Sequence, residues 1–281
     1  MVLVTVLHQS PSIAVLDYRC DAKPDDPSYD EHHTRYSVSY VRRGSFGYRT
    51  RGRAYELVPG ATLLGRAGDD FRCSHDHHIA GDECLSFQFS EEFAETFGGS
   101  AKSWWSGAVP PVSALMALGE LASHTASPRC ALGLDELAMY FSARLFACVS
   151  GQLEGPVRVH ERDRKRAVDA ALLIEARSTE ALNVEHVAAT IGLSPFHFLR
   201  TFRAVLGVTP HQYLIRCRLR RAASLLTTDL GITEIAYEVG FGDLSNFVRT
   251  FHRACGASPR AFRRAARGDR KIFQERLRRL S

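Results

Sequence analysis

The side chains with the clearest recognition chemistry lie in two short segments, residues 195–203 and 244–252. Both segments carry arginine and other polar residues spaced three or four apart, as one face of a helix requires. Arginine can donate two hydrogen bonds to guanine O6 and N7, and asparagine can pair with adenine in the same bidentate way. The candidate base-facing residues are Phe196, His197, Arg200, Arg203, Ser245, Asn246, Arg249 and His252.

A second set of arginines lies between these segments, in a stretch that we expect to form one long helix from Thr209 to Leu226. Apolar residues such as Tyr213 and Leu214 would bury part of this helix and leave its arginines outside. Exposed guanidinium groups neutralise DNA phosphates and release counterions, although the same groups are also common on a simple solvated face. The candidate phosphate-binding residues are Arg216, Arg218, Arg220 and Arg221.

An internal repeat supplies the elements that would position these side chains. Ala188 and Gly192 recur 48 residues later as Ala236 and Gly240, and the pattern around Phe198 recurs 49 residues later. Each copy resembles a helix-turn-helix: a small residue where the helices meet, a glycine in the turn, and a capping residue before the second helix. An ordinary helical bundle with basic exposed faces is the alternative interpretation.

Charge and composition agree with a polyanion partner for the second half of the chain. Residues 161–281 hold 22 Lys and Arg against 12 Asp and Glu, whereas residues 1–160 hold 14 against 19. A basic domain attracts nucleic acid. No apolar run is long enough to span a membrane, so no membrane partner is expected. The seven irregularly spaced cysteines indicate reduced thiols and a cytoplasmic protein rather than a disulfide framework.

The repeat also carries a family resemblance. Residues 232–264, ITEIAYEVGFGDLSNFVRTFHRACGASPRAFRR, resemble the signature of the AraC/XylS family of bacterial transcription regulators, with Phe262 and Arg263 at its end, where the first is more usually tyrosine. The resemblance implies a seven-helix fold in which a rod joins two DNA-reading helices. It places Phe196, Arg200, Ser245, Asn246 and Arg249 where family members touch bases of double-stranded DNA. It further implies contact with RNA polymerase and activation of transcription.

The first half of the chain is strand-rich from about residue 35 to 90, which predicts a barrel or sandwich. Through His32-His33 and residues 40–44 and 55–60, it resembles, more weakly, the cupin-like sensing domain of one branch of the family. The resemblance implies a small effector inside and a helix at 134–149 that would form a homodimer. The predicted class is therefore α+β with two domains. The expected divisions are 1–155 for sensing and dimerisation, 156–163 for a linker, 164–267 for DNA binding, and 268–281 for a helical tail.

One local cluster in the first half could bind a metal ion. On a strand, Cys73, His75 and His77 share one face, and Cys84 follows nearby. Thiolate and imidazole together suit zinc or a similar ion, so a metal-sensing or thiol-sensing regulator is an alternative, as is a cupin-type enzyme fused to a DNA-binding module. A polar strand end without any ion is the simpler interpretation, and we predict neither a cofactor nor an enzymatic activity.

Overall fold

The computed structural model describes residues 2–24, 26–76, 78, 81–97, 101–125, 133–149 and 159–268. The strands are β1 (Val2–Gln9), β2 (Ile13–Cys20), β3 (Asp30–His32), β4 (Tyr36–Gly44), β5 (Phe46–Thr50), β6 (Arg53–Leu57), β7 (Thr62–Gly65), β8 (Asp70–Ser74), β9 (Asp82–Phe89) and β10 (Ala108–Val109). The helices of the first half are α1 (Glu91–Phe97), the 3-10 helix η1 (Ala101–Ser106), α2 (Ser113–Thr125) and α3 (Leu134–Val149). Those of the second half are α4 (Glu161–Ala176), α5 (Val184–Thr190), α6 (Pro195–Leu206), α7 (Pro210–Leu225), α8 (Ile232–Glu238), α9 (Leu244–Cys255) and α10 (Pro259–Ala266).

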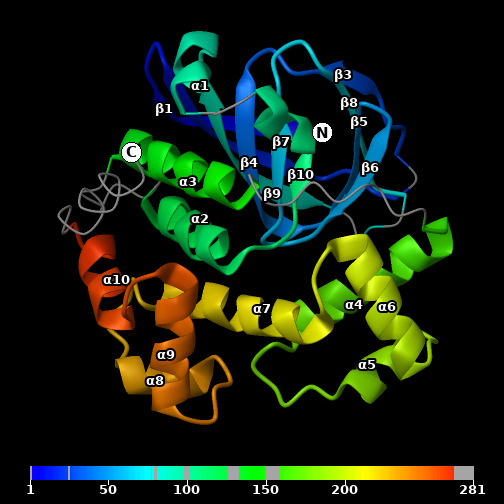
Figure 1. Ribbon diagram of the computed structural model, residues 1–281, viewed down its shortest axis with the longest axis vertical. Helices are drawn as coiled ribbons and strands as arrows, with labels where there is room; N and C mark the ends of the chain where they lie inside the picture. Colours follow the sequence, from blue (N-terminus) through cyan, green and yellow to red (C-terminus); the bar gives the residue numbers. More distant parts are fainter. Residues whose placement is uncertain are drawn as a thin grey trace.

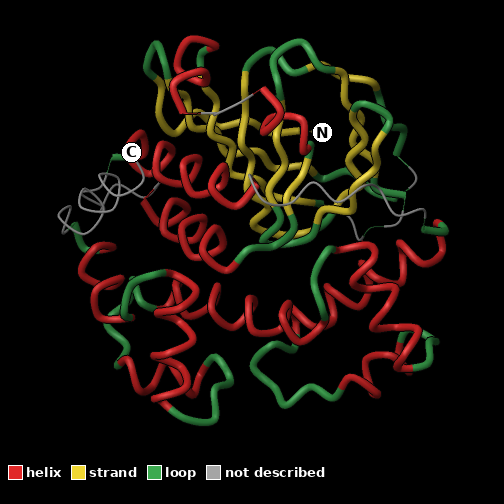
Figure 2. Tube along the Cα trace, in the orientation of Figure 1, coloured by secondary structure: helices red, strands yellow, loops and turns green. Residues whose placement is uncertain are grey.

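The molecule has a β-rich upper half and a helical lower half, which confirms the α+β class (Figures 1 and 2). The strands form a six-stranded sheet in the order β1-β2-β9-β4-β7-β10 and a four-stranded sheet in the order β3-β8-β5-β6. Of the predicted barrel or sandwich, the closed barrel is wrong, because the hydrogen bonds of the described strands make two separate sheets. The chain passes from one sheet to the other at Gly44, whose φ of 70° permits the sharp bend.

Alternation along the central strands explains why the six-stranded sheet is covered on both faces. Phe87 of β9 lies opposite Val38 of β4, and both are fully buried on the face that meets α2 and α3. Val41 and Cys84 are also paired across these strands and lie three residues from Val38 and Phe87. They therefore point the other way, toward the four-stranded sheet. One sheet thus contributes to two separate cores.

Helix α3 packs on its own sheet. The ring of Phe141 lies 5.9 Å from that of Tyr40 and 5.2 Å from that of Phe87. The apolar stripe that predicted a dimerising helix, which includes Leu137 and Leu145, is buried inside the chain. It therefore gives no support to a dimer contact through α3.

The two halves meet where α2 lies along α7 (Figure 1). The Tyr213 hydroxyl of α7 donates to the carbonyl oxygen of Pro59 at 3.3 Å, and His124 Nε2 lies 2.9 Å from Ser224 Oγ. Helix α7, which carries the two helix-turn-helix units, is thus attached to the β-rich half along its length.

Some expectations fall on residues that the structure does not describe. Residues 156–158 of the expected linker (156–163) and residues 269–281 of the expected tail lie outside the described ranges, as does His77. Helix α4 already begins at Glu161. Among the described helices, none has the length and apolar character needed to cross a membrane.

Candidate nucleic-acid interface

The first helix-turn-helix unit consists of α5 and α6. Ala188 in α5 is fully buried, so α6 can approach closely. Gly192 in the turn has a φ of 68°, in the left-handed region that favours glycine. Helix α6 begins after Ser194, whose hydroxyl accepts a hydrogen bond from the backbone N–H of His197 at 3.4 Å, and Pro195 stands in its first turn. These local signals agree with the sequence prediction.

Two phenylalanines fix α6 against the rest of the unit. Phe198 and Phe202 are fully buried, and their rings meet edge to face at 5.6 Å. Phe202 also contacts the ring of Tyr213 in α7 at 5.8 Å. Because both inward positions are filled by large rings, the opposite face of α6 must point outward.

The outward face of α6 holds the side chains predicted to contact bases. Phe196 is 78% exposed, so its ring is open to a partner. Arg200 and Arg203 are exposed as well, and His197 is half-buried. The structure therefore brings all four predicted residues of the first copy onto a surface that a partner can reach.

The second unit, α8 and α9, repeats this design, but its turn glycine packs more closely against the backbone than that of the first unit. Gly240 in the turn has a φ of 91°, and a Cβ atom there would lie 2.7 Å from the carbonyl oxygen of Thr179. The Asp243 carboxylate caps α9 by accepting from the backbone N–H of Asn246 at 2.7 Å. Phe251 is fully buried and packs on Phe262 of α10, with ring centroids 5.4 Å apart.

The outward face of α9 is polar and partly organised. Ser245, Arg249 and His252 are exposed, and Asn246 is half-buried. The Asn246 side-chain oxygen accepts hydrogen bonds from Arg249 at 3.4 Å and from the Thr250 hydroxyl at 3.3 Å. An open hollow runs along this face, and its lining residues are Leu244, Ser245, Val248, Arg249, His252 and Ser258.

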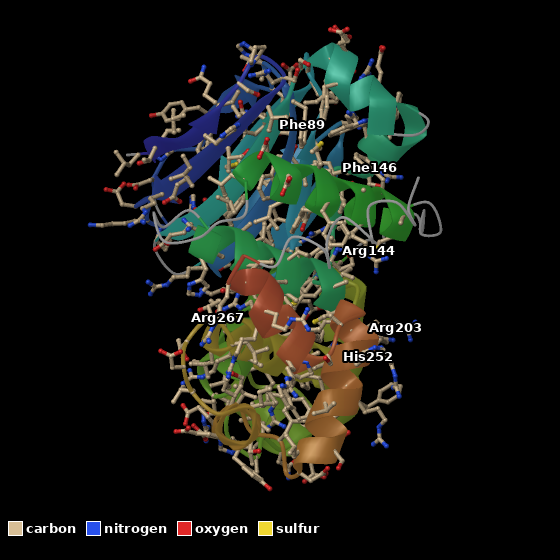
Figure 3. All side chains as sticks on the ribbon, turned by 90° about the vertical axis from the view of Figure 1, so that its left-hand side faces the viewer. Phe89, Arg144, Phe146, Arg203, His252 and Arg267 are labelled. Atoms are coloured by element: carbon tan, nitrogen blue, oxygen red, sulfur yellow. The ribbon has the colours of Figure 1, made fainter. Side chains whose placement is uncertain are left out.

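Helix α7 separates the two units, with α5 and α6 at one end and α8 and α9 at the other (Figure 1). Figure 3 shows Arg203 of α6 and His252 of α9 on the same side of the helical half. With 16 residues, α7 is about 24 Å long at 1.5 Å per residue. The two outward faces are therefore held apart on one side of the molecule by a rigid spacer.

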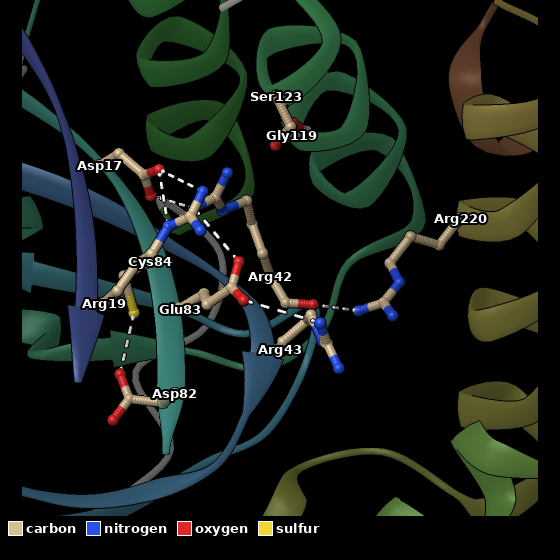
Figure 4. Close-up of polar contacts among 10 residues, drawn as sticks. All are labelled: Asp17, Arg19, Arg42, Arg43, Asp82, Glu83, Cys84, Gly119, Ser123 and Arg220. Carbon is tan, nitrogen blue, oxygen red and sulfur yellow. Dashed lines mark hydrogen bonds and ion pairs between the residues drawn. The ribbon is translucent and has the colours of Figure 1, made fainter. Parts of the chain in front are cut away.

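The structure places Arg220 inside the protein, contrary to its predicted role at a phosphate. Its guanidinium pairs with Glu175 of α4, lies 3.7 Å from Glu120 of α2, and donates to the carbonyl oxygen of Arg42 at 3.1 Å (Figure 4). Only 15% of the side chain is exposed. Because the β-rich half covers this side of α7, a periodic pattern within the helix could not reveal the burial.

Two other arginines of α7 also bind backbone oxygens of the protein. Arg216 donates to the carbonyl oxygen of Pro111, and Arg218 donates to that of Ser178 at 2.7 Å. Arg221 differs, because it is half exposed and its ion pair with Glu238 is equally open to solvent. Of the four predicted phosphate contacts, Arg221 has the arrangement that best suits that role.

The sequence interpretation missed two exposed apolar residues in the helix-turn-helix units. Leu199 is 42% exposed and Tyr237 is 56% exposed. Leu199 lies three residues after Phe196 and four before Arg203, so helical periodicity alone places it on the reading face. An apolar side chain there can contact a thymine methyl group in the major groove.

The predicted metal cluster in the β-rich half is only partly brought together. His75 Nε2 lies 2.9 Å from an oxygen of Asp82, and Cys84 Sγ lies 3.8 Å from the other oxygen. Burial raises the pKa of the Cys73 and Cys84 thiols, so both stay protonated at neutral pH. A protonated thiol is a poor nucleophile, which argues against the thiol-sensing alternative at these two positions.

Comparison with known proteins places the helical half among DNA-binding regulators. A family described as a helix-turn-helix domain matches residues 187–265. The MmsAB operon regulatory protein of Pseudomonas aeruginosa is 34% identical over 87 residues, which cover 31% of this chain and 28% of that protein. The HTH-type transcriptional activator RhaS of Enterobacter is 27% identical over 247 residues, which cover 83% of this chain and 87% of the relative. Among solved structures, the DNA-binding domain of AdpA in complex with a target DNA is 33% identical and covers 37% of this chain and 96% of its own, with a TM-score of 0.36.

Proposed function

The chain belongs to the AraC/XylS family of bacterial transcription regulators, and from this premise we propose how it reads its operator. It is a sequence-specific DNA-binding regulator of transcription and not an enzyme. Helices α6 and α9 enter successive major-groove segments on one side of a single duplex. Such segments lie about 34 Å apart, one turn of B-DNA.

The observation that carries this proposal is the pair of outward faces held by α7. Both reading helices are capped, fixed by buried phenylalanines, and expose an arginine on the side away from the core. A helix of about 24 Å with a reading helix beyond each end supports a spacing close to one turn.

We assign the specific contacts as follows. Arg200 and Arg249 would donate to guanine, Asn246 would pair with adenine, and Phe196 would contact a thymine methyl group. Arg221 would bind a phosphate. The remaining base-facing candidates are His197, Arg203, Ser245 and His252.

The β-rich half, residues 1–155, is proposed to be a cupin-like effector-sensing domain, and residues 164–267 the DNA-binding domain. The β-rich half is attached along α7, the helix that spaces the two reading helices. This supports a regulatory role, because a shift of α2 would change the position of α7. The effector is proposed to be a small molecule bound by this half of the chain.

A homodimer remains part of the proposal, with a different contact from the one first expected. Strand β1 is an edge of the six-stranded sheet and leaves apolar side chains open to solvent. These are Val2, Leu3, Val4 and Val6, which are 45–60% exposed. An open apolar edge supports pairing with β1 of a second copy.

Activation is the proposed direction of control. The RhaS relative is named a transcriptional activator, and we extend this to the present chain. Contact with RNA polymerase, in the cytoplasm where bacterial DNA lies, is proposed from the family resemblance of residues 232–264.

Binding-site selection on random duplex DNA tests the proposal. We expect two conserved half-sites about one helical turn apart. A parallel selection with the Arg200→Ala variant should relax one half-site and leave the other intact. Recovery of a single site, or of unselected DNA, would refute the two-helix arrangement.

A further inference from the structure

Three side chains with metal-binding atoms meet at one end of the β-rich half: Cys20, His75 and Asp82. The cysteine sulfur, one imidazole nitrogen and one carboxylate oxygen all lie within 4.8 Å of one another. These residues lie outside the DNA-reading helices, so their chemistry is independent of the function proposed above.

The backbone holds these three residues together through both sheets. Cys20, the last residue of β2, is paired directly with Asp82, the first residue of β9. The pairing extends past the strand ends, because the Gly81 N–H donates to the carbonyl oxygen of Ala22 at 3.0 Å. His75 comes from the other sheet, directly after β8. A ligand bound by all three would therefore tie the two sheets together.

The Asp82 carboxylate is almost enclosed, and its nearest described partner is the His75 imidazole. The His75 and Asp82 side chains are only 9% and 10% exposed. Asp82 contacts the His75 imidazole at 2.9 Å and the Cys84 thiol at 3.8 Å, the second of which is drawn in Figure 4. In the part of the chain that the structure describes, no arginine or lysine forms an ion pair with Asp82. Burying a carboxylate is costly unless a positive charge compensates it.

The donor set selects a class of ion. Sulfur, nitrogen and oxygen ligands together suit a borderline-soft divalent ion such as Zn²⁺, whereas Mg²⁺ and Ca²⁺ prefer sites made of oxygen alone. Zn²⁺ bonds of about 2.0–2.3 Å in a tetrahedron put ligand atoms roughly 3.3–3.8 Å apart. Small side-chain rotations would bring the three present atoms to that spacing. A thiolate and a carboxylate would balance the charge of the ion.

We propose that Cys20, His75 and Asp82 bind one Zn²⁺-class ion that joins the two sheets of the β-rich half. The fourth position would be filled by water. This set shares only His75 with the cluster of Cys73, His75, His77 and Cys84 that the sequence singled out. The other two ligands become neighbours through strand pairing between residues far apart in the chain.

Cobalt substitution tests the site on the full chain. The reduced, chelator-treated protein is titrated with Co²⁺, which reports thiolate ligation by a charge-transfer absorption, and Zn²⁺ is then added as competitor. We expect about one equivalent of ion with that absorption, and its displacement by Zn²⁺. The Cys20→Ser variant should lose the absorption, whereas Cys148→Ser, at a half-buried cysteine near the end of α3, should keep it.

A second measurement covers the case in which Cys20→Ser does not fold. X-ray absorption of the Zn²⁺-loaded parent protein should show at least one sulfur ligand together with nitrogen or oxygen ligands. In addition, Zn²⁺ should raise the melting temperature of the parent and of a control with the exposed His186 changed to Gln, but not that of Asp82→Asn. A parent protein that binds no stoichiometric ion, a site without sulfur, or an unchanged absorption in folded Cys20→Ser would overturn the proposal.

Discussion

Arg220 of α7 donates a hydrogen bond to the backbone carbonyl oxygen of Arg42 in β4, at 3.1 Å, and thereby joins the helical half to the β-rich half (Figure 4). The same guanidinium pairs with Glu175 and lies 3.7 Å from Glu120. One side chain thus connects α7 with α4, α2 and the central sheet. We regard this contact as structural, since the guanidinium has little room for an outside partner.

Replacement of Arg220 by Met should destabilise the protein strongly. The two glutamates would remain, 21% and 17% exposed, without their shared counter-charge. Loss of one partner from a buried ion pair costs about 3–5 kcal/mol, to be measured as the free energy of unfolding in urea. Arg177→Met is the control, because its ion pair with Glu180 is exposed to solvent and should contribute little to stability. Similar losses in the two variants would contradict the buried role of Arg220.

The packing of α5 against α6 can be tested with two adjacent alanines. Ala188 is fully buried, whereas Ala189 is exposed in the same helix. Ala188→Leu should overpack the contact between the helices and cost about 1–3 kcal/mol of unfolding free energy. Ala189→Leu should change stability by less than about 0.5 kcal/mol. If both variants have the same unfolding free energy as the parent protein, the close approach of the two helices is not required.

Local signals made the helix-turn-helix units predictable from sequence. Caps such as Ser194 and Asp243 and turn glycines such as Gly192 act within four or five residues, so their effect can be read directly from spacing. The long helix was expected from Thr209 to Leu226 and is observed at Pro210–Leu225 with Thr209 as its cap. The fold of the helical half follows from these short-range rules.

Contacts between distant segments were not predictable in the same way. Arg220 and Arg221 are neighbours with similar sequence surroundings, yet one is covered by α2 and α4 and the other is half exposed. Likewise, no spacing indicates that Cys20 pairs with Asp82 across two strands. Helical and strand periodicity report which face of an element is apolar, but not which other element covers it.

The two turn glycines should respond differently to alanine. Both have positive φ, so each substitution strains the backbone by about 1–2 kcal/mol. At Gly240 the new Cβ would also lie 2.7 Å from the Thr179 carbonyl oxygen, whereas at Gly192 it would meet open space. Gly240→Ala should therefore lower the melting temperature clearly more than Gly192→Ala. The reverse order, or equal shifts, would show that the Thr179 contact relaxes without cost.

Loss of the Arg249 guanidinium should reduce base discrimination more than overall attraction to DNA. A bidentate base contact is worth about 1–3 kcal/mol, so Arg249→Ala should relax one position of the operator by that amount. Arg221→Ala should instead weaken binding to all sequences. It should also reduce the slope of log affinity against log salt concentration by about the contribution of one phosphate contact. Affinities for matched and single-base-changed duplexes at several salt concentrations separate the two effects. Uniform weakening by Arg249→Ala would place that residue at a phosphate.

The stability of the β-rich half should fall in mild acid because of His33. Its ring stacks on Phe71, with centroids 4.2 Å apart, and its Nε2 lies 2.9 Å from the Tyr48 hydroxyl. Burial, with a smaller contribution from the charge of Arg51, lowers the pKa of His33 from 6.5 to about 4. Between these values the unfolded chain binds the proton and the folded chain does not, so lowering the pH favours unfolding.

The stabilising effect is complete above pH 6.5 and is lost as the pH falls toward 4, which amounts to about 3 kcal/mol over the window. His33→Gln should remove this part of the pH dependence, whereas His186→Gln, at an exposed histidine, should leave it unchanged. Urea unfolding of the three proteins at a series of pH values measures the difference. Parallel curves for the parent and His33→Gln would mean that another group controls the acid response.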